Sequence, residues 1–384
     1  MGTIDFNNPL HVACGWANLQ EPGDETAGLL RSLVGADTAL EMVMTHEHAN
    51  VVVSYLKDQP EAAAHNFEKA WQRWRARLDT THIENDLATM ERLGGWVIYP
   101  GHELWPEAVE DLGLAAPVAI WGLGSLLPEG QLPPVRVAIV GARACTAAGE
   151  RHAWELGHEL AHDGVSVVSG GAFGIDIAAH HGALKAGHTL AVMAGGLSQL
   201  YPRAHEESFQ QVVESGGGII SEVPPFWRPA RWRFVSRNRV IAAISDATIM
   251  VEAASRSGAV VTLARAMEMG REVGAYPGPV GSPTTEGCHQ AIRNGATLVT
   301  CASHVLEMVR PLGQVEDADA TAPLFDLAPD EQRVFDAMPK RRAARAQDIA
   351  VAAGLGVDET LGILARLVLG GKVSAAQQRY ARRT

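Results

Sequence analysis

Short apolar runs alternate with longer segments of helical spacing along residues 135–300. Residues 137–140 are all apolar and largely β-branched, which is typical of a strand buried on both faces of a parallel sheet. Helical spacing follows over 147–162, with Thr146 as the N-cap. The alternation continues with strands expected at 165–169, 189–194, 218–222, 247–252 and 272–276, and helices at 174–186, 204–215, 235–244, 258–269 and 285–294. It predicts an α/β fold, a doubly wound and mostly parallel sheet covered by helices on both faces.

The pattern is different before this segment. Residues 1–95 have mainly helical spacing, with helices expected at 26–34, 36–44, 66–78 and 86–93. Residues 96–100 predict a short strand, and residues 121–124, which include two glycines, suggest a connector that docks on the sheet. We therefore expect an N-terminal helical domain at 1–95 and a sheet domain at 96–310.

The C-terminal part forms a third segment. Residues 311–328 contain several acids and no lysine or arginine, which predicts a linker. Helices are expected at 331–338, 346–352 and 358–369, before a possible wing at 372–375. Helix, turn, helix and wing is the pattern of a winged-helix domain, here 329–384. From Pro329 onwards ten basic and six acidic side chains give this segment a positive charge. Such modules bind duplex DNA or other proteins, and both uses stay open.

The composition narrows the class of protein. With 384 residues, 47% of them hydrophobic, the chain can form two or three domains with ample cores. A net charge of −12 argues against general coating of nucleic acid, so any such binding must be local. The four cysteines include no C-x-x-C pair, which indicates neither a zinc site nor a disulfide framework. There is no recognisable signal sequence or apolar run of membrane-spanning length, and we expect a protein of a reducing cytoplasm.

One stretch concentrates positive charge. Residues 226–239 contain five arginines and four aromatic residues, and no acid occurs between Glu222 and Asp246. Arginine side chains match phosphate oxygens, and aromatic rings stack on unpaired bases. The residues are Arg228, Arg231, Arg233, Arg237 and Arg239, with Phe226, Trp227, Trp232 and Phe234. This composition favours single-stranded nucleic acid as the ligand. An exposed basic loop, or arginines paired with distant acids, would give the same pattern.

Glycine-rich turns follow four of the predicted strands, at 141–143, 169–174, 195–196 and 255–258. In a doubly wound sheet they all lie at the carboxyl edge, where ligands bind. Glycines let backbone N–H groups approach phosphate. The turn at 169–174 begins with Ser169 instead of the first glycine of G-x-G-x-x-G, and no acid follows in 189–194, so NAD is not expected. A Walker-type ATP motif and a G-x-S-x-G elbow are also missing. The edge therefore suits phosphate, and no cofactor is expected.

Asp176 and His180 lie one helical turn apart and could in principle hold a metal ion or exchange a proton. No third ligand has a recognisable spacing. We interpret Asp176 as a helix-start residue that bonds to backbone or to the histidine, and predict neither a catalytic nor a metal site.

The motifs of the sheet domain resemble the DNA-processing protein A family, also called DprA or Smf. The similarity runs through VAIVGARACTAAG from residue 137, SGGAFGIDIAAHHGAL from 169, TLAVMAGGLSQLYP from 189, IISEVPP from 219, RFVSRNRVIAAIS from 233 and SGAVVTLARAMEMGREVGAYPG from 257. The combination of GID-x-x-AH, F-x-x-RNR and SG-x-x-x-T is specific to the family. The chain departs from the usual family pattern at Ala142, Gly171 and Ala259. These departures affect fine contacts of the pocket and not the fold.

The resemblance implies an extended Rossmann-like domain that binds single-stranded DNA in a basic pocket at the carboxyl edge of the sheet. It further implies a homodimer that delivers the strand to a RecA-type recombinase during natural transformation, without catalytic activity. The DNA-binding residues carried over by motif are Arg143, Ser169, Gly170, Gly171, Lys185, Arg231, Phe234, Arg237, Asn238, Arg239, Ser257 and Gly258. Arg239 could instead tie strands together, and Phe234 could belong to the core.

Two other functions stay open. A nucleotide phosphoribohydrolase of the lysine-decarboxylase-like class has a related sheet, but its PGG-x-GT motif and glutamate pair are missing from the equivalent residues 252–266. Glu222 and Glu252 are stray candidates for its acid chemistry. A regulator that binds duplex DNA would act through the winged helix. Release of free base from nucleoside monophosphates would identify the enzyme, and preference for duplex would identify the regulator.

Overall fold

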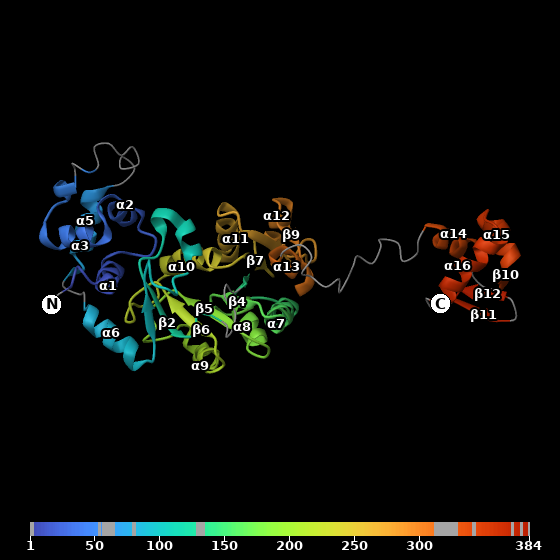
Figure 1. Ribbon diagram of the computed structural model, residues 1–384, viewed down its shortest axis with the longest axis horizontal. Coiled ribbons are helices and arrows are strands. Elements are labelled where there is room, and N and C mark those ends of the chain that lie inside the picture. Colours follow the sequence, from blue (N-terminus) through green and yellow to red (C-terminus); the bar gives the residue numbers. More distant parts are fainter. Residues whose placement is uncertain are drawn as a thin grey trace. The chain divides into compact units, whose positions relative to one another are not determined.

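The computed structural model describes residues 4–52, 55, 66–78, 82–127, 135–310, 329–339, 343–369, 372–376 and 379–382 (Figure 1). The chain divides into two compact units, residues 1–315 and 316–384. The linker predicted at 311–328 lies outside the described residues. Among the helices of the described ranges, none is both long and apolar enough to span a membrane.

A mixed sheet of nine described strands forms the centre of the first unit, in the order β1-β2-β6-β5-β4-β3-β7-β8-β9. The strands are β1 (Trp96–Ile98), β2 (Ile120–Gly124), β3 (Arg136–Val140), β4 (Ser166–Ser169), β5 (Thr189–Met193), β6 (Gly218–Ser221), β7 (Ala247–Met250), β8 (Glu272–Ala275) and β9 (Thr297–Leu298). Strands β3 to β9 are parallel, and β1 and β2 add an antiparallel edge. The predicted α/β fold is confirmed. Because β3 lies between β4 and β7, the strand order reverses there, which is where such sheets bind ligands.

Helices cover both faces of the parallel strands. On one face α7 (Ala147–His162), α8 (Ile175–Ala183) and α13 (Ala302–Val309) share an apolar cluster with Val137 and Ile139 of β3. On the other face α10 (Arg231–Ala243), α11 (Gly258–Glu268) and α12 (Glu286–Arg293) pack with Ala138 and Val140. Successive residues of β3 thus point to opposite, equally buried faces, as strand geometry requires. The remaining helical elements of this part are η5 (Arg203–His205) and α9 (Glu206–Glu214).

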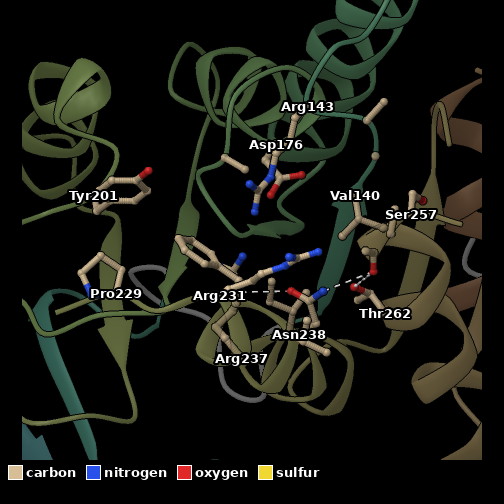
Figure 2. Close-up of a pocket in the computed structure, with 18 of the residues that line it drawn as sticks. Val140, Arg143, Asp176, Tyr201, Pro229, Arg231, Arg237, Asn238, Ser257 and Thr262 are labelled. Carbon is tan, nitrogen blue, oxygen red and sulfur yellow. Dashed lines mark hydrogen bonds between the residues drawn. The ribbon is translucent and has the colours of Figure 1, made fainter. Parts of the chain in front are cut away.

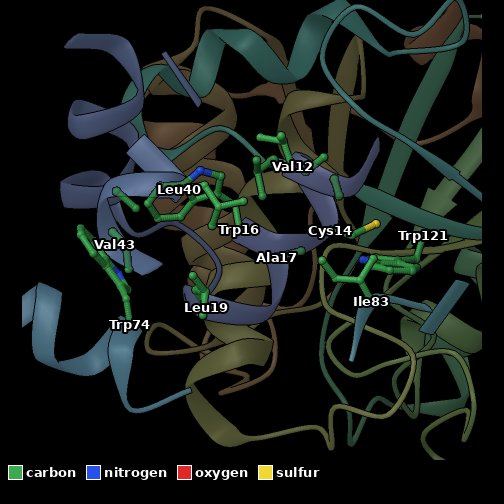
Figure 3. Packing of buried hydrophobic residues seen from close by; sticks show 14 of the residues in the cluster. Val12, Cys14, Trp16, Ala17, Leu19, Leu40, Val43, Trp74, Ile83 and Trp121 are labelled. Carbon is green, nitrogen blue, oxygen red and sulfur yellow. The ribbon is translucent and has the colours of Figure 1, made fainter. Parts of the chain in front are cut away.

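The N-terminal helices pack directly on the sheet. They are α1 (Pro9–Leu19), α2 (Glu25–Val34), α3 (Ala36–Thr45), η1 (Ala49–Val52), α5 (Phe67–Arg75) and α6 (Ile83–Arg92), and η4 (Glu107–Ala115) follows β1. The buried rings of Trp16 and Trp74 meet edge to face with centroids 5.6 Å apart. Figure 3 shows Trp16 beside Leu40, and Trp121 of β2 beside Ile83. The same apolar cluster continues into Met193 of β5. The helices and the sheet therefore share one core, and a domain boundary at residue 95 stays a prediction.

Several elements differ from the sequence prediction, which also lacks η4, β9 and α13. Helix α1 is absent from it, and residues 121–124, predicted as a connector, form most of β2. The two glycines in this strand give it the composition of a loop. Glycine is needed at position 122, because a Cβ there would lie 2.1 Å from the ring of Trp96. Helix α10 begins at Arg231 instead of residue 235, so part of the basic stretch is helical. The first turn of α10 exposes Arg231 and Trp232, and it therefore lacks the apolar periodicity that reveals a helix.

The second unit contains α14 (Pro329–Ala337), β10 (Ala344–Arg345), α15 (Ala346–Ala353), α16 (Val357–Leu369), β11 (Val373–Ala376) and β12 (Arg379–Arg382). Its strands pair antiparallel in the order β10-β12-β11. Gly354 ends α15 in the left-handed conformation with φ of 66°, which reverses the chain before α16. Val334, Ile349 and Leu364 meet in the core. The described elements follow the order expected of a winged helix, and its binding role stays a prediction.

Candidate nucleic-acid interface

A pocket of about 610 Å³ opens at the carboxyl end of β3, where the strand order reverses (Figure 2). One wall is the turn from Val140 to Arg143. The other walls are the first turns of α10 and α11, together with Tyr201 and Pro229. The positions of the two helix starts follow from the doubly wound topology, because both helices succeed strands whose carboxyl ends lie at this edge.

Seven of the twelve residues predicted to bind DNA line this one pocket. They come from three separate parts of the chain and are Arg143, Arg231, Phe234, Arg237, Asn238, Ser257 and Gly258. Figure 2 shows the Arg143 side chain descending from one side and Arg231 and Asn238 facing it from α10. Ser169, Gly170, Gly171, Lys185 and Arg239 are not among the lining residues.

The ring of Phe234 lies within the pocket wall. The Arg143 guanidinium is 5.1 Å from the ring centroid, and the ring of Tyr201 is tilted by 57° at a centroid separation of 5.7 Å. Phe234 is only partly buried and belongs to none of the apolar clusters of the described residues. A ring that faces a cavity and is flanked by a cation can stack on a base.

Arg237 is buried and holds the floor of the pocket together. Its guanidinium donates to the carbonyl of Val192 and, at 2.8 Å, to that of Gly170, which links α10 to the ends of β5 and β4. A Cβ at Gly170 would lie 2.4 Å from the Arg237 guanidinium, so a larger residue there would displace Arg237 from these hydrogen bonds. Burial lowers the pKa of Arg237 to about 10, so the group stays charged at neutral pH. It positions the pocket and also contributes positive charge to it.

Asn238 connects the two helix starts. Its Oδ1 accepts from Arg237 Nε at 3.2 Å, and its Nδ2 donates to the carbonyl of Gly258 at 3.2 Å (Figure 2). Ser257 is the N-cap of α11, where its Oγ accepts from the backbone N–H of Val260. The amide of Asn238 thus fixes the distance between α10 and α11.

The other arginines of the basic stretch divide into paired and exposed ones. Arg239 points away from the pocket and forms an ion pair of 2.5 Å with Glu222, with both side chains 9% exposed. Arg233 donates two hydrogen bonds of 2.9 Å to Glu21, in the loop between α1 and α2. Arg228 and Arg231 are exposed and form no ion pair with a described residue. Only part of the positive charge is therefore available to a ligand.

Glu21 accepts hydrogen bonds from several side chains on this side of α10. It accepts from Arg233, Arg77 and the Trp232 indole N–H. Burial alone would raise the pKa of Glu21, but the hydrogen bonds and charge of Arg233, with the charge of Arg77, lower it overall. The ring of Trp227 contacts both guanidinium groups, with its centroid 4.4 Å from that of Arg233 and 4.8 Å from that of Arg77. The sequence could not reveal this cluster, because its members are far apart along the chain.

The residues of the glycine turn after β4 make contacts within the protein. Ser169 is buried and donates from Oγ to the carbonyl of Ile139 at 2.6 Å. Gly171 has φ of 63°, and a Cβ there would lie 2.6 Å from the ring of Phe209. Lys185 is exposed just beyond the end of α8. In this structure these residues lie outside the pocket, and a direct DNA contact by any of them stays a prediction.

The two acids that could support acid–base chemistry are held by protein partners. Glu252 accepts from the backbone N–H of Thr146 at 2.9 Å and from its hydroxyl at 2.6 Å, and so fixes the start of α7. Glu222 is paired with Arg239. Neither carboxylate lines the pocket.

Asp176 and His180 do not meet as a catalytic pair. His180 is fully buried, with Nδ1 2.7 Å from the hydroxyl of Thr189, and burial lowers its pKa to about 3. Asp176 lines the pocket near Arg143 (Figure 2). Burial raises the pKa of its carboxyl, and the cations of Arg237 and Arg143 oppose that rise. The described residues contain no group of three or more histidines, cysteines or acids able to hold a metal ion.

Several lining residues were not predicted from the sequence to bind DNA. Tyr201, Pro229 and Thr262 line the pocket. Tyr201 follows the Gly195-Gly196 turn after β5, and an aromatic residue so close to a glycine turn at the carboxyl edge was a usable signal. Thr262 is the threonine of the SG-x-x-x-T motif that begins at Ser257, whereas Pro229 carries no such signal.

Comparisons with known proteins agree on one family. The family model described as DNA recombination-mediator protein A matches residues 96–310. A DNA processing protein DprA of Mycobacterium tuberculosis is 40% identical over 322 residues, which cover 80% of this chain and 82% of the relative.

Two solved structures are similar to more than half of the chain. DNA processing protein A from Streptococcus pneumoniae has a TM-score of 0.61 and 27% identity, with 79% of this chain and 99% of that chain covered. The protein from Helicobacter pylori, whose structure was described for its single-stranded DNA binding mode, has a TM-score of 0.50 and 26% identity, with 56% and 94% covered.

Proposed function

Because the chain belongs to the family of DNA recombination-mediator protein A, we propose that it binds single-stranded DNA in the pocket at the carboxyl edge of its sheet. One observation carries the proposal. The accessible ring of Phe234 is flanked by Arg143 and shares its pocket with the exposed Arg231. A stacking ring beside unpaired cations is the combination that holds an unpaired nucleotide without reading its sequence.

The strand would contact the pocket through two kinds of group. Phosphates would meet Arg143, Arg231 and the neighbouring Arg228, which are all exposed. A base would stack on Phe234, with Tyr201 as the second ring of the platform. Duplex DNA would bind more weakly, because its bases are already stacked and cannot reach Phe234.

We further propose that the protein acts as a cytoplasmic homodimer that delivers the strand to a RecA-type recombinase on incoming DNA during natural transformation. The family resemblance supports this step, which requires a protein that holds single strands without consuming them. The test is recombinase-catalysed ATP hydrolysis on an oligonucleotide coated with single-strand binding protein. Wild-type chain should raise the rate and Arg143→Ala should raise it much less. Equal rates with and without the wild-type chain would contradict delivery.

The binding proposal is tested by fluorescence anisotropy of labelled oligo-dT and of a matched duplex across a salt series. Tight and salt-sensitive binding to oligo-dT, with weak duplex binding, is the expected result. Absence of oligo-dT binding at low salt would refute it. Preference for duplex would instead assign DNA binding to the second unit.

A nucleotide phosphoribohydrolase is less well supported. Its chemistry needs an available carboxylate beside the bound sugar, and Glu252 and Glu222 are both engaged outside the pocket. Asp176 lines the pocket, but its carboxyl is buried beside the cations of Arg237 and Arg143. Release of free base from nucleoside monophosphates would reverse this judgement.

A further inference from the structure

A second cavity, of about 830 Å³, lies between α1, α2 and the segment from Tyr99 to Val118. It shares no lining residue with the proposed DNA pocket. The apolar part of its wall includes Phe6, Val12 and Leu114. Its size falls within the range of roughly 300–1,000 Å³ that is typical of small-molecule sites.

A tight helix contact forms the wall of this cavity. Gly28 of α2 lies so close to the chain that a Cβ there would be 2.0 Å from the carbonyl oxygen of Leu114. The turn at Gly113, with φ of 57°, directs the chain onward to Pro117. On this side the cavity is thus bounded by backbone that packing holds in place, and this wall does not depend on one movable side chain.

Arg31 contributes a cation to the cavity wall. Its guanidinium donates to Gln20 Oε1 and lies 5.4 Å from the centroid of Trp16. Among the residues that line the cavity, Arg31 carries the positive charge, and it forms no ion pair with any of the described residues. Burial lowers the pKa of Arg31 to about 10, and the carboxylates of Asp24, Glu222 and Glu110 oppose that shift without forming a direct ion pair with it. The group is therefore a partly desolvated cation that no direct ion pair satisfies, which favours an anion.

Two acids restrict which anion can enter. Asp37 and Glu110 line the cavity and are both exposed. Glu110 accepts from the indole N–H of Trp105 at 2.7 Å, which holds its carboxylate in place. Carboxylates at an opening repel a polyanion such as a nucleic acid strand and can accept from an N–H donor. The charge pattern therefore suits a ligand with one negative charge, an apolar body and a hydrogen-bond donor.

We propose that this cavity binds a small organic monoanion with an aromatic or branched apolar body, whose acidic group meets Arg31. The site is separate from the proposed DNA pocket, and its occupation does not depend on the proposed function. The apolar body would replace water along Val12 and Leu114, and an N–H group would face Asp37 or Glu110.

A matched pair of fluorescent probes tests the proposal on the full chain. Anilinonaphthalene sulfonate has an aromatic body, one sulfonate and an N–H group, and phenylnaphthylamine is nearly the same molecule without the sulfonate. Wild-type protein should bind the sulfonate with one-to-one stoichiometry and prefer it to the neutral probe by about tenfold or more, as expected for a charge-assisted contact. Equal affinity for the two probes would overturn the role of Arg31.

Two variants locate the binding site, and one serves as control. Arg31→Met removes the charge and should abolish the preference for the sulfonate. Ser32→Phe adds bulk at an exposed lining position and should weaken both probes. Arg143→Met alters the DNA pocket only and should leave both affinities unchanged.

Far-UV circular dichroism and thermal unfolding of each variant show whether it is folded. If Arg31→Met does not fold, the test rests on Ser32→Phe. Unchanged probe binding in Ser32→Phe would then refute the proposal that the probe binds in this cavity. Displacement of the sulfonate by oligo-dT, or its loss in Arg143→Met, would assign the binding to the DNA pocket and would also overturn the proposal.

Discussion

Arg231 and Arg233 lie two residues apart on α10, yet the structure gives them different surroundings. Arg231 is exposed and lines the pocket, whereas Arg233 is held by two hydrogen bonds of 2.9 Å to Glu21. Arg231→Met should therefore remove a phosphate contact. Arg233→Met should remove an internal ion pair and leave the number of phosphate contacts unchanged. The pair forms a matched test, because the substitution and the helix are the same.

The magnitude follows from counterion release. Three exposed arginines, Arg143, Arg228 and Arg231, predict that log K falls with log salt at a slope of about −2, taking about −0.7 per contact on a single strand. Without Arg231 the slope should become shallower by about 0.7. At about 0.1 M salt the loss of one such contact corresponds to roughly fivefold in affinity, or about 1 kcal/mol. All five arginines of the basic stretch together with Arg143 would instead predict a slope of about −4.

The assay is anisotropy of labelled oligo-dT between about 50 and 200 mM salt, a range in which this electrostatic term changes strongly. The wild-type slope and the slope of each variant are compared, and thermal unfolding confirms that both variants are folded. A shallower slope in Arg233→Met, equal to that of Arg231→Met, would refute the reasoning. It would mean that the Arg233 to Glu21 pair opens when DNA binds.

Three further predictions concern single residues. Phe234→Ala should lose about 1–3 kcal/mol of oligo-dT affinity if the ring stacks on a base, and an unchanged Kd in a folded variant would place the ring in the core. Gly170→Ala should lower the urea midpoint of unfolding, because the added Cβ would lie 2.4 Å from Arg237. Gly258→Ala should leave the midpoint unchanged, because the nearest atom to its Cβ is 3.6 Å away. Equal midpoints for the two variants would contradict this. His180 has a pKa of about 3 in the folded chain against an ordinary value of 6.5, so only the unfolded state takes up a proton as the pH falls below that value. Stability should therefore fall from pH 7 to pH 5 by about 2 kcal/mol more in wild type than in His180→Gln, on the basis of proton linkage, and parallel urea curves for the two proteins would exclude it.

Strands buried on both faces were the most predictable part of the fold. The run at 137–140 is apolar because its alternate side chains enter two different clusters, and this requirement is visible in the sequence. Strand β2 was missed for a tertiary reason. Position 122 requires glycine because the ring of Trp96 packs against it. A strand that contains two glycines has the local composition of a connector.

The candidate site was predictable to the extent that motif position fixes sheet position. Arg143 and Ser257 follow β3 and β7, so their approach at the carboxyl edge follows from topology. Which arginines are engaged within the protein could not be predicted. The partners of Arg237 and Arg239 are a backbone carbonyl after β4 and the carboxylate of Glu222, and only folding brings these groups together.

The contact between Glu21 and α10 bears on how a working fragment should be cut. A boundary at the start of the family match, residue 96, would keep every residue that lines the pocket. It would also remove Glu21, which binds Arg233, and the carbonyl of Pro22, which accepts from Ser236 at 2.8 Å. The same cut would expose the side of the core that Trp16 fills. A fragment meant for binding studies, or a chimera with a relative, should therefore carry the N-terminal helices and α10 from the same parent.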